Sequence, residues 1–573
     1  MKLPLILRAL LPLLYLAQGN QAAHISIQNP ILPGFNPDPA ILRVGTDYYL
    51  AVSSFEYHPG IPIYHSTDLQ TWTLHSHALT TPTQLPLHGI PTAAGAWAPS
   101  LSLINGTYHL TLTIRWTYDP IAKLWPRVFW VTSPDLKTWS EPIWADPWGI
   151  DPDLFTDPAT NKTYLTLMAP NNNIDRLWGI SQCEVDLHTG SCLSPYRSIW
   201  NGTLPQTPSS RPEGPKLLKR GKYYYLLIAE GGTDELHRAT IARSTSPTGP
   251  WESNPDNPLL YNGAYGFTNL TVQSTGHATM FDTPEGDWCA VFLARRNIDG
   301  FSPLGRETFL CAVEWVGGWP VFNRGGPILL NSEENPKAVP GDFVDEFEGE
   351  ALGSSWYLLR TPYAEGRASG LILRPNVFSL SDRDTPAAVF RKQTSLNMTF
   401  AATLLPFEGG SLGPRQTVGV SAYLSELQHQ DIGITGCRTE TGNRGGLCVY
   451  VEMLNNGTRE YTEHPLRTRS NGKQENGLTL YIRAAPHEYK MGYSYSSSKG
   501  YSDSHVEVTW LTSFPSSYLA TAPPDWFVFS GAMFGLFASG NGEPWPVSGP
   551  RVGFERVREV YFEERIADYG LSA

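Results

Sequence analysis

The stretch Gly45-Thr-Asp-Tyr48-Tyr-Leu, a polar turn that leads into a short aromatic strand, recurs four more times along the chain. The other copies are Asn105-Gly-Thr-Tyr108-His-Leu, Asn161-Lys-Thr-Tyr164-Leu-Thr, Gly221-Lys-Tyr-Tyr224-Tyr-Leu and Gly286-Asp-Trp288-Cys-Ala-Val. From Tyr48 the intervals are 60, 56, 60 and 64 residues. A unit of this length with several short strands is typical of a β-propeller blade. The repeat therefore predicts an all-β protein in which residues 24–335 form a five-bladed propeller.

Three of the five units also share a second signature. It reads Ser66-Thr-Asp-Leu-Gln-Thr-Trp72, Ser133-Pro-Asp-Leu-Lys-Thr-Trp139 and, more loosely, Ser244-Thr-Ser-Pro-Thr-Gly-Pro-Trp251. Two signatures with one period favour the propeller over its alternative, a long meander or sandwich with unrelated Tyr-rich strands.

The period disappears after about Gly341, where a second segment begins. Its alternating runs, such as Leu478-Thr-Leu-Tyr-Ile-Arg483 and Val506-Glu-Val-Thr-Trp510, indicate half-buried strands. We expect residues 341–573 to form a β-sandwich.

Composition limits the function before any motif is considered. The 573 residues carry 54 acidic and 42 basic side chains, a net charge of −12, which opposes nucleic acid as a partner. The chain holds 18 Trp, 27 Tyr and 23 Phe, so a neutral ligand that stacks on rings, such as a sugar, is the better expectation.

The N-terminus has the order of a secretory signal. Met1-Lys2 precedes a Leu-rich run from Leu3 to Leu16 and then small residues up to Ala23, which predicts a signal peptide over 1–23 and an extracellular protein. The run is too short for a membrane anchor, and no other segment of the sequence is long and apolar enough to span a bilayer. Six N-x-[ST] sequons agree with eukaryotic secretion and predict a glycoprotein: Asn105, Asn161, Asn201, Asn269, Asn397 and Asn456.

Six cysteines stand as three close pairs: Cys183 with Cys192, Cys289 with Cys311, and Cys437 with Cys448. In an oxidising compartment disulfides are expected, and although 15 connectivities are open, we predict pairing between neighbours. Neither a C-x-x-C motif nor zinc-ligand spacing occurs.

The repeat also indicates where the chemistry lies. About ten to thirteen residues before each aromatic strand is an earlier segment of the unit, which we take as the innermost strand of its blade. These segments begin at Asn36-Pro-Asp38-Pro, Trp97-Ala-Pro-Ser100, Ile150-Asp151-Pro-Asp153, Arg211-Pro-Glu213-Gly and Gly276-His277-Ala. If each leading residue faces the channel, Asp38, Asp151, Glu213 and His277 converge on one pocket. Carboxyl groups gathered in this way repel one another, so at least one has a raised pKa and can donate a proton, as glycoside hydrolysis requires.

At these residues the chain resembles glycoside hydrolase family 43, the β-xylosidases and α-L-arabinofuranosidases, in a secreted fungal-type form. Pro33-Gly-Phe-Asn-Pro-Asp38-Pro resembles the catalytic-base motif, and Ser53-Ser-Phe55-Glu-Tyr-His-Pro-Gly60 resembles the strand that follows it. The resemblance covers nearly the whole mature chain and includes a C-terminal concanavalin-like, jelly-roll sandwich.

The resemblance implies a role for each matched residue. Asp38 is the general base, Glu213 the general acid, and Asp151 the third acid, which adjusts pKa and orients substrate. Arg306, Trp97, Phe55 and His277 are the implied substrate-binding residues. The implied reaction is a single displacement with inversion that releases a terminal pentose from xylan or arabinoxylan oligosaccharides of the plant cell wall. We favour β-xylosidase activity, with α-L-arabinofuranosidase or both activities as the alternative.

Some features depart from that pattern or extend it. Relatives often have His where this chain has Ser100, and Asp153 is an extra acid on the same strand as Asp151 that competes for the pKa-adjusting role. His277 is either a buried structural residue or a ligand contact. The resemblance implies no required cofactor, although a structural calcium ion can lie near this position at the axis.

The segment Phe529–Gly535 is the candidate sandwich loop that helps to close the active site.

Two further classes remain as alternatives. A propeller lectin would need aromatic pockets without convergent acids. A fructan hydrolase of the invertase type would use Asn-Asp-Pro-Asn-Gly and Glu-Cys motifs, which this sequence lacks.

Overall fold

The computed structural model describes residues 27–170, 177–264, 266–330, 338–362, 366–367, 370–406, 412–438, 446–466, 477–495, 507–521 and 528–564. The predicted signal peptide, 1–23, lies outside these residues. In the described part of the chain, strands make up nearly all of the regular structure, together with three short 3-10 helices, η3 (Pro120–Ala122), η4 (Asn323–Gly325) and η7 (Ser516–Leu519). No helix in these ranges is long and apolar enough to cross a bilayer.

The N-terminal half of the chain is a five-bladed propeller, as the repeat predicts. Each blade is a four-stranded antiparallel sheet whose strands follow one another in chain order. Blade 1 contains β1 (Ala40–Val44), β2 (Asp47–Ala51), β4 (Gly60–Ser66) and β5 (Thr73–Leu79). Blade 2 contains β6 (Gly95–Ile104), β7 (Thr107–Arg115), β8 (Arg127–Ser133) and β9 (Ile143–Trp148).

The remaining blades repeat this arrangement. Blade 3 contains β10 (Ile150–Thr156), β11 (Thr163–Pro170), β12 (Trp178–Glu184) and β13 (Arg197–Trp200). Blade 4 contains β14 (Glu213–Arg220), β15 (Tyr223–Glu230), β16 (Arg238–Ser244) and β17 (Glu252–Ser253), and blade 5 contains β18 (Val272–Asp282), β19 (Trp288–Arg296), β20 (Glu307–Val316) and β21 (Trp319–Phe322). The five repeated aromatic strands are the second strands of the five blades.

The first strands line the axis and close the ring. Contacts run from β1 to β6, β10, β14 and β18 and back to β1. The segment before blade 1 pairs with blade 5, since the backbone N–H groups of Ile31 and Leu32 both donate to the carbonyl of Thr308. The two ends of the propeller are therefore joined through blade 5.

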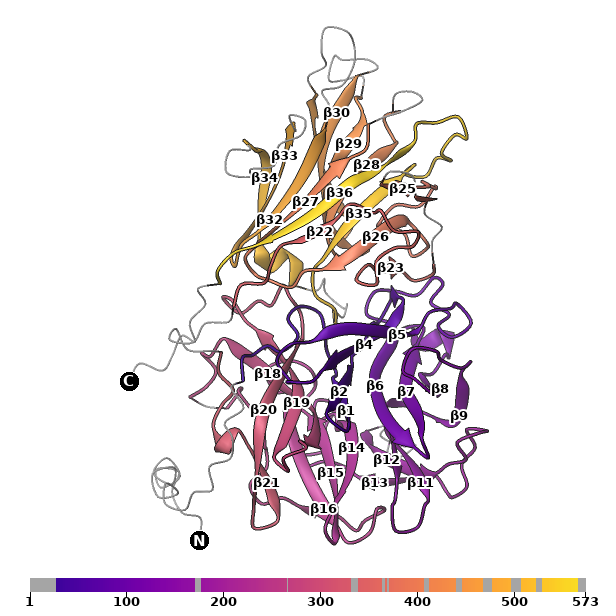
Figure 1. Ribbon diagram of the computed structural model, residues 1–573, viewed down its shortest axis with the longest axis vertical. Coiled ribbons are helices and arrows are strands. Elements are labelled where there is room, and N and C mark those ends of the chain that lie inside the picture. The colour runs from indigo at the N-terminus through magenta and orange to yellow at the C-terminus, as the bar shows by residue number, and fades with distance from the viewer. Residues whose placement is uncertain are drawn as a thin grey trace.

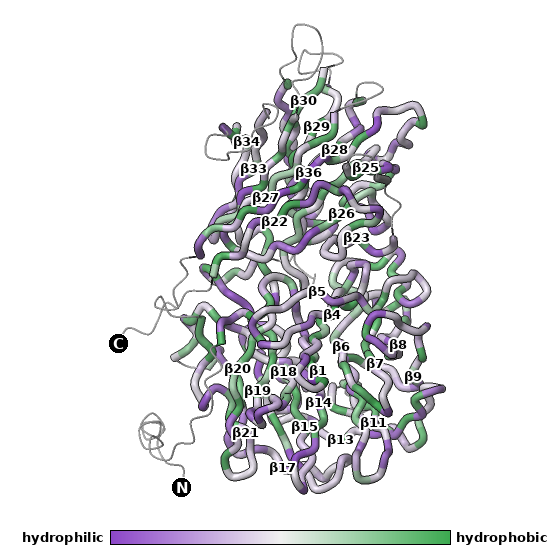
Figure 2. The backbone as a smooth tube through the Cα atoms, in the orientation of Figure 1, coloured by the Kyte–Doolittle hydropathy of each residue, from purple (hydrophilic) through white to green (hydrophobic). Residues whose placement is uncertain are grey.

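The C-terminal half is a sandwich of two antiparallel sheets (Figure 1). One sheet contains β22 (Phe343–Asp345), β24 (Gly366–Arg367), β25 (Leu371–Leu373), β27 (Met398–Leu404), β32 (Leu478–Ala484), β33 (Glu488–Tyr495), β34 (Thr509–Pro515) and β36 (Val552–Tyr561). The other contains β26 (Ala387–Lys392), β28 (Thr417–Ser425), β29 (Gln428–Gly436), β30 (Leu447–Asn455), β31 (Thr458–Pro465) and β35 (Met533–Ser539). Apolar side chains from both sheets, such as Phe400, Val420, Ile432 and Phe534, form the core between them. Hydrophobic and hydrophilic residues are interspersed along the sandwich strands (Figure 2).

The two domains are joined by backbone pairing and by buried aromatic contacts. Strand β23 (Leu358–Leu359) of the C-terminal half pairs with β3 (Tyr57–His58) of the propeller. One apolar cluster contains Phe35 and Tyr57 from the propeller and Phe390 and Tyr423 from the sandwich. The sandwich therefore packs directly against the elements that carry the candidate site.

Two of the three predicted disulfides are present. Cys183 is bonded to Cys192 and Cys437 to Cys448. The prediction was wrong for Cys289 and Cys311, which are buried free thiols. In the β19–β20 pair, Cys311 lies opposite Ala290, so Cys289 points to the other face of the sheet, because neighbouring residues on a strand alternate. The two sulfurs accordingly belong to different apolar clusters.

Candidate active site

All five inner strands enter the axis through the same local backbone. In each blade one residue within the inner strand, or just before it in blade 1, has a positive φ angle. These residues are Asp38 (56°), Ala98 (36°), Asp151 (56°), Gly214 (57°) and His277 (50°). A proline follows this residue in four blades and alanine in the fifth. In blades 2 to 5 the pairing register to the second strand shifts at this point. Positive φ is uncommon outside glycine and often marks functional backbone, so the five-fold repeat of this bend directs these residues toward the axis.

This alignment corrects the expected equivalence of the acids. Asp38, Asp151 and His277 occupy the positive-φ position, whereas Glu213 precedes it and is equivalent to Trp97 and Ile150. Glu213 still lines the same pocket, which encloses about 250 Å³. Because a bulge re-aims neighbouring side chains, residues at either position can face one cavity.

Asp38 is buried among groups that favour its ionised form. Its Oδ1 accepts a hydrogen bond from Arg306 Nη1 at 3.0 Å, and its Oδ2 accepts one from Ser53 Oγ at 2.6 Å. Burial alone would raise the pKa of Asp38, but Arg306, His277 and the Ser53 hydroxyl together hold it below its usual value. This carboxylate is thus suited to accept a proton.

The surroundings of Asp151 and Glu213 instead raise the pKa values of these two carboxyl groups. Asp151 Oδ2 accepts a hydrogen bond from the backbone N–H of Gly214 at 3.0 Å, which connects the two acid-bearing blades. Burial raises the pKa of both carboxyl groups. The negative charge of Asp38 raises the pKa of Asp151 further, and the negative charge of Asp151 raises the pKa of Glu213 further. Within one pocket, Asp38 is kept ionised while the pKa values of Asp151 and Glu213 are raised, so that this pair retains a proton, which Glu213 holds while Asp151 is charged. General acid and base work requires such a division.

Asp153 belongs to a separate polar layer beneath the pocket. Its Oδ1 accepts a hydrogen bond from Ser100 Oγ at 2.6 Å, and its Oδ2 accepts one from the backbone N–H of Leu217 at 3.0 Å. The buried Lys216 donates to the carbonyl of Pro99 at 3.4 Å and interacts with Asp153 and Asp151. Asp151 lines the pocket and Asp153 does not. The unusual Ser100 therefore has a structural partner in Asp153.

His277 lies beside Asp38, with Nδ1 3.6 Å from Asp38 Oδ1. Burial lowers the pKa of His277 to about 4, which leaves the imidazole neutral. Within the described residues, no set of three or more His, Cys, Asp or Glu side chains is arranged to hold a metal ion. The structural calcium ion expected near His277 at the axis stays a prediction.

Aromatic side chains from both domains form the wall of the pocket. The Phe55 ring lies 6.1 Å from Trp97 and 5.9 Å from Phe529, and Trp97 and Phe529 meet edge to face at 5.5 Å. Phe529 comes from the sandwich, and its carbonyl accepts a hydrogen bond from Arg306 Nε at 3.4 Å. The predicted loop therefore reaches the pocket through this residue.

Several pocket residues escaped the sequence analysis: Arg115, Tyr118, Ile150, Met168, Trp178, Arg211 and Thr233. Arg115 lies over the rings of Tyr118 and Trp97, with its guanidinium carbon 4.4 and 5.4 Å from their centroids. Ile150 begins a first strand, Arg115 and Met168 lie near the ends of second strands, Trp178 begins a third strand, and the other three lie in loops. At these positions the repeat has no constant residue type. Ile150 and Arg211 stand in the inner-strand segments that the repeat identifies, and Thr233 stands in the segment Ala229-Glu-Gly-Gly-Thr233.

Comparisons with known proteins agree with this geometry. Residues 27–320 match the family model described as "Glycosyl hydrolases family 43", and residues 344–546 match "Beta xylosidase C-terminal Concanavalin A-like domain". A non-reducing end alpha-L-arabinofuranosidase from Bacteroides ovatus is 36% identical over 410 residues, which cover 69% of this chain and 74% of that protein. A beta-xylosidase from Bacillus subtilis is 36% identical over 396 residues, 65% of this chain and 73% of that protein.

Solved structures resemble the whole molecule as well as its domains. The crystal structure of a xylan beta-1,4-xylosidase from Bacillus halodurans superposes with a TM-score of 0.81 at 29% identity, covering 94% of this chain and all of that one. Family, fold and site agree: the chain belongs to glycosyl hydrolases family 43 and is an exo-glycosidase of the β-xylosidase and α-L-arabinofuranosidase kind.

Proposed function

We propose that this chain is a secreted enzyme that releases terminal pentose from xylan or arabinoxylan oligosaccharides with inversion, and that β-xylosidase is its main activity. The observation that carries this proposal is the division of protonation in one pocket, where Arg306 favours an ionised Asp38 while burial and charge favour a protonated Glu213. The relatives with both xylosidase and arabinofuranosidase names support the substrate class.

The proposed reaction is a single step. Asp38 takes a proton from water as that water attacks the anomeric carbon, and Glu213 donates its proton to the departing glycosidic oxygen. Asp151, held by the Gly214 N–H, keeps Glu213 protonated through its position and charge. Arg306 holds Asp38 and binds sugar hydroxyls, while Trp97 and Phe55 provide ring surfaces and His277 packs beneath the terminal sugar.

Proton NMR of the first product tests the stereochemistry. Inversion predicts that a β-xyloside initially yields α-xylose, and initial release of β-xylose would exclude the single displacement.

Hydrolysis of aryl β-xyloside and aryl α-L-arabinofuranoside side by side tests the substrate preference. A higher kcat/KM for the arabinofuranoside would favour the alternative specificity.

A fructan hydrolase of the invertase type and a propeller lectin do not match the family found by the comparisons. Release of fructose from sucrose, or sugar binding without hydrolysis, would nevertheless support them over the present proposal.

Secretion and glycosylation are part of the proposal. Five sequon asparagines are exposed, namely Asn105, Asn161, Asn201, Asn269 and Asn456. The sixth, Asn397, is half-buried, and its Nδ2 donates a hydrogen bond to the carbonyl of Glu563 at 2.7 Å. Since a glycan is attached through that nitrogen, we expect modification at the five exposed sites and not at Asn397. Mass spectrometry of glycopeptides from protein secreted by a eukaryotic host tests this, and an unmodified secreted chain would contradict it.

A further inference from the structure

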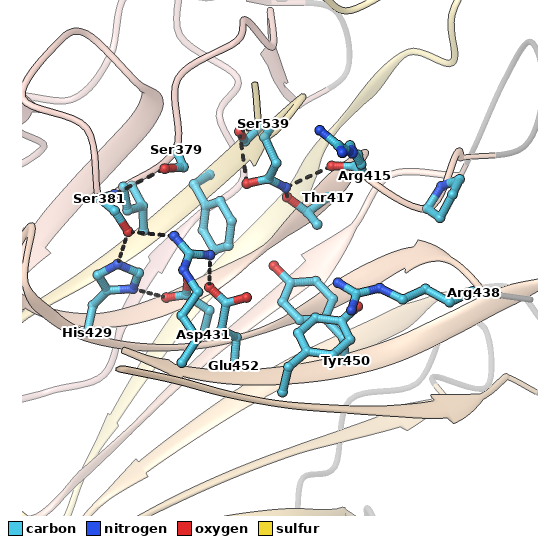
Figure 3. Close-up of a pocket in the computed structure, with 16 residues that line it drawn as sticks. Ser379, Ser381, Arg415, Thr417, His429, Asp431, Arg438, Tyr450, Glu452 and Ser539 are labelled. Atoms are coloured by element: carbon cyan, nitrogen blue, oxygen red, sulfur yellow. Dashed lines mark hydrogen bonds and ion pairs between the residues drawn. The ribbon is translucent and has the colours of Figure 1, made fainter. Parts of the chain in front are cut away.

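The outer face of the sandwich carries a second pocket of about 190 Å³ that shares no lining residue with the candidate active site. It lies over β28, β29, β30, β31 and β35. Figure 3 shows His429, Asp431, Glu452 and Tyr450 on one side of this pocket, opposite Arg415, Thr417 and Ser539. The opposite face of the same strands packs into the sandwich core.

Two paired glycines lie in the sheet between two of the rings that line the pocket. In the register of the sheet, Phe537, Gly419, Gly433 and Tyr450 lie side by side on four adjacent strands and therefore on one face. A Cβ atom at Gly433 would lie 2.9 Å from the Tyr450 ring, so that ring leans over the glycine. Tyr461 stacks on Tyr450 at 5.6 Å with an interplanar angle of 14°.

Polar groups surround this aromatic floor. Asp431 is 5% exposed, and its Oδ1 lies 3.0 Å from His429 Nδ1. Its Oδ2 has no hydrogen-bond partner among the described residues and stands at the pocket. This oxygen is open to the pocket, where it needs a hydrogen-bond partner in place of water when a ligand binds. A ligand hydroxyl in the pocket would provide one.

The charges in the pocket are balanced. Arg459 Nη1 lies 2.6 Å from Glu452 Oε1, Arg438 Nε 3.4 Å from Glu463 Oε1, and Arg415 Nε 3.3 Å from Glu543 Oε1. With each arginine already paired, the site has no excess positive charge for a phosphate or uronate. Rings beside hydroxyl, carboxylate and guanidinium groups instead suit a neutral ligand that has both an apolar face and many hydroxyls.

We propose that this pocket is a non-catalytic site for a neutral saccharide unit, distinct from the site of hydrolysis. The half-buried Tyr461, stacked on the buried Tyr450, provides the ring surface, and Asp431 Oδ2 accepts a hydrogen bond from a sugar hydroxyl. The pocket lies in the domain that packs on the propeller, so a saccharide held here is tethered to the chain that carries the active site. This inference goes beyond the proposed hydrolysis and does not depend on it.

Isothermal titration calorimetry with xylohexaose tests the site in the full chain carrying Glu213→Gln, which prevents hydrolysis. We expect that adding Asp431→Asn or Tyr461→Ala removes one binding event or weakens it at least tenfold. Tyr461→Phe keeps the stacked ring and should retain that event. The matched control is Trp510→Ala, which removes an aromatic side chain that is 43% exposed on the other sheet. It should leave the number and affinity of the binding events unchanged.

The same number and affinity of binding events in all these variants would overturn the proposal. Melting temperatures report whether the variants are folded, and Tyr461 is only half-buried on the edge strand β31. The outcome is separable from the proposed function, because a chain that hydrolyses no xyloside could still show the Tyr461-dependent event. Cellohexaose and arabinohexaose serve as further neutral ligands, and absence of a Tyr461-dependent event with all three oligosaccharides would also refute the site.

Discussion

Arg306 Nη1 lies 3.0 Å from Asp38 Oδ1, although the two residues are 268 positions apart in the chain. The same guanidinium donates through Nε to the carbonyl of Phe529 in the sandwich. One arginine thus connects the ionisation of the proposed base to the loop from the second domain.

We expect Arg306→Gln to move the acidic limb of the pH profile upward. Arg306 helps to lower the pKa of Asp38, so without it the carboxylate is protonated at higher pH and loses its function as a base. The profile of kcat/KM against pH checks this. The control is Arg324→Gln, because Arg324 is exposed and paired with Glu314 far from the acids. An unchanged acidic limb would show that Arg306 does not control Asp38.

The proposed acid and base should respond differently to the leaving group. Asp38→Ala is expected to reduce kcat by about 10²–10⁴-fold on every substrate, since water must always be activated. Glu213→Ala should cause a similar loss on xylobiose but a much smaller one on a dinitrophenyl glycoside, whose leaving group needs no proton. Circular dichroism confirms folding. Equal losses on both substrates in Glu213→Ala would remove it from the role of general acid.

Phe529→Ala tests whether the sandwich completes the active site. The ring contacts Phe55 and Trp97 in the pocket, so its removal should lower kcat/KM about tenfold or more even on a short soluble aryl glycoside. A loss confined to polymeric substrate would indicate a role in polymer binding instead.

The close approach of Gly531 to the propeller positions that loop. A Cβ atom at Gly531 would lie 2.2 Å from the carbonyl oxygen of Leu304, so Gly531→Ala must push the two segments apart. We expect a fall in kcat/KM similar to that of Phe529→Ala. Gly341→Ala is the control, because its Cβ meets nothing within 4 Å. Normal activity in Gly531→Ala would mean that the loop position is not critical.

Glu56 makes the interface between the two domains sensitive to pH. It is fully buried, its Oε2 accepts from the Ala93 N–H at 3.2 Å, and its backbone carbonyl accepts from Arg360 of the sandwich half. Burial raises the pKa of Glu56 to about 8. The stability from this raised pKa is present below the unfolded value near 4.5 and is lost as the pH rises through about 8.

Glu56→Gln should therefore flatten the decline of melting temperature between these two pH values. Thermal unfolding across that range measures the slope. The control is Glu314→Gln on the exposed surface, which should keep the parent slope. A Glu56→Gln protein whose slope matches the parent would place the pH dependence elsewhere, for example in Asp151 and Glu213.

The sequence by itself determined the propeller, its period and the segments that carry the acids. This was possible because the blades repeat one short-range pattern, an aromatic second strand in all five and an inner strand with a Pro bend in four. The sandwich was also visible, since strands with one buried face alternate in sequence. Neither inference needed a long-range contact.

Only the tertiary structure decided how these parts meet. The one-residue offset of Glu213 from Asp38 and Asp151 depends on the bulge in the inner strand of blade 4, which shifts register without a unique sequence mark. The strand register likewise separates Cys289 from Cys311. Phe529 reaches the pocket through the packing of the two domains, and non-local contacts of this kind are set by the global fold rather than by local sequence.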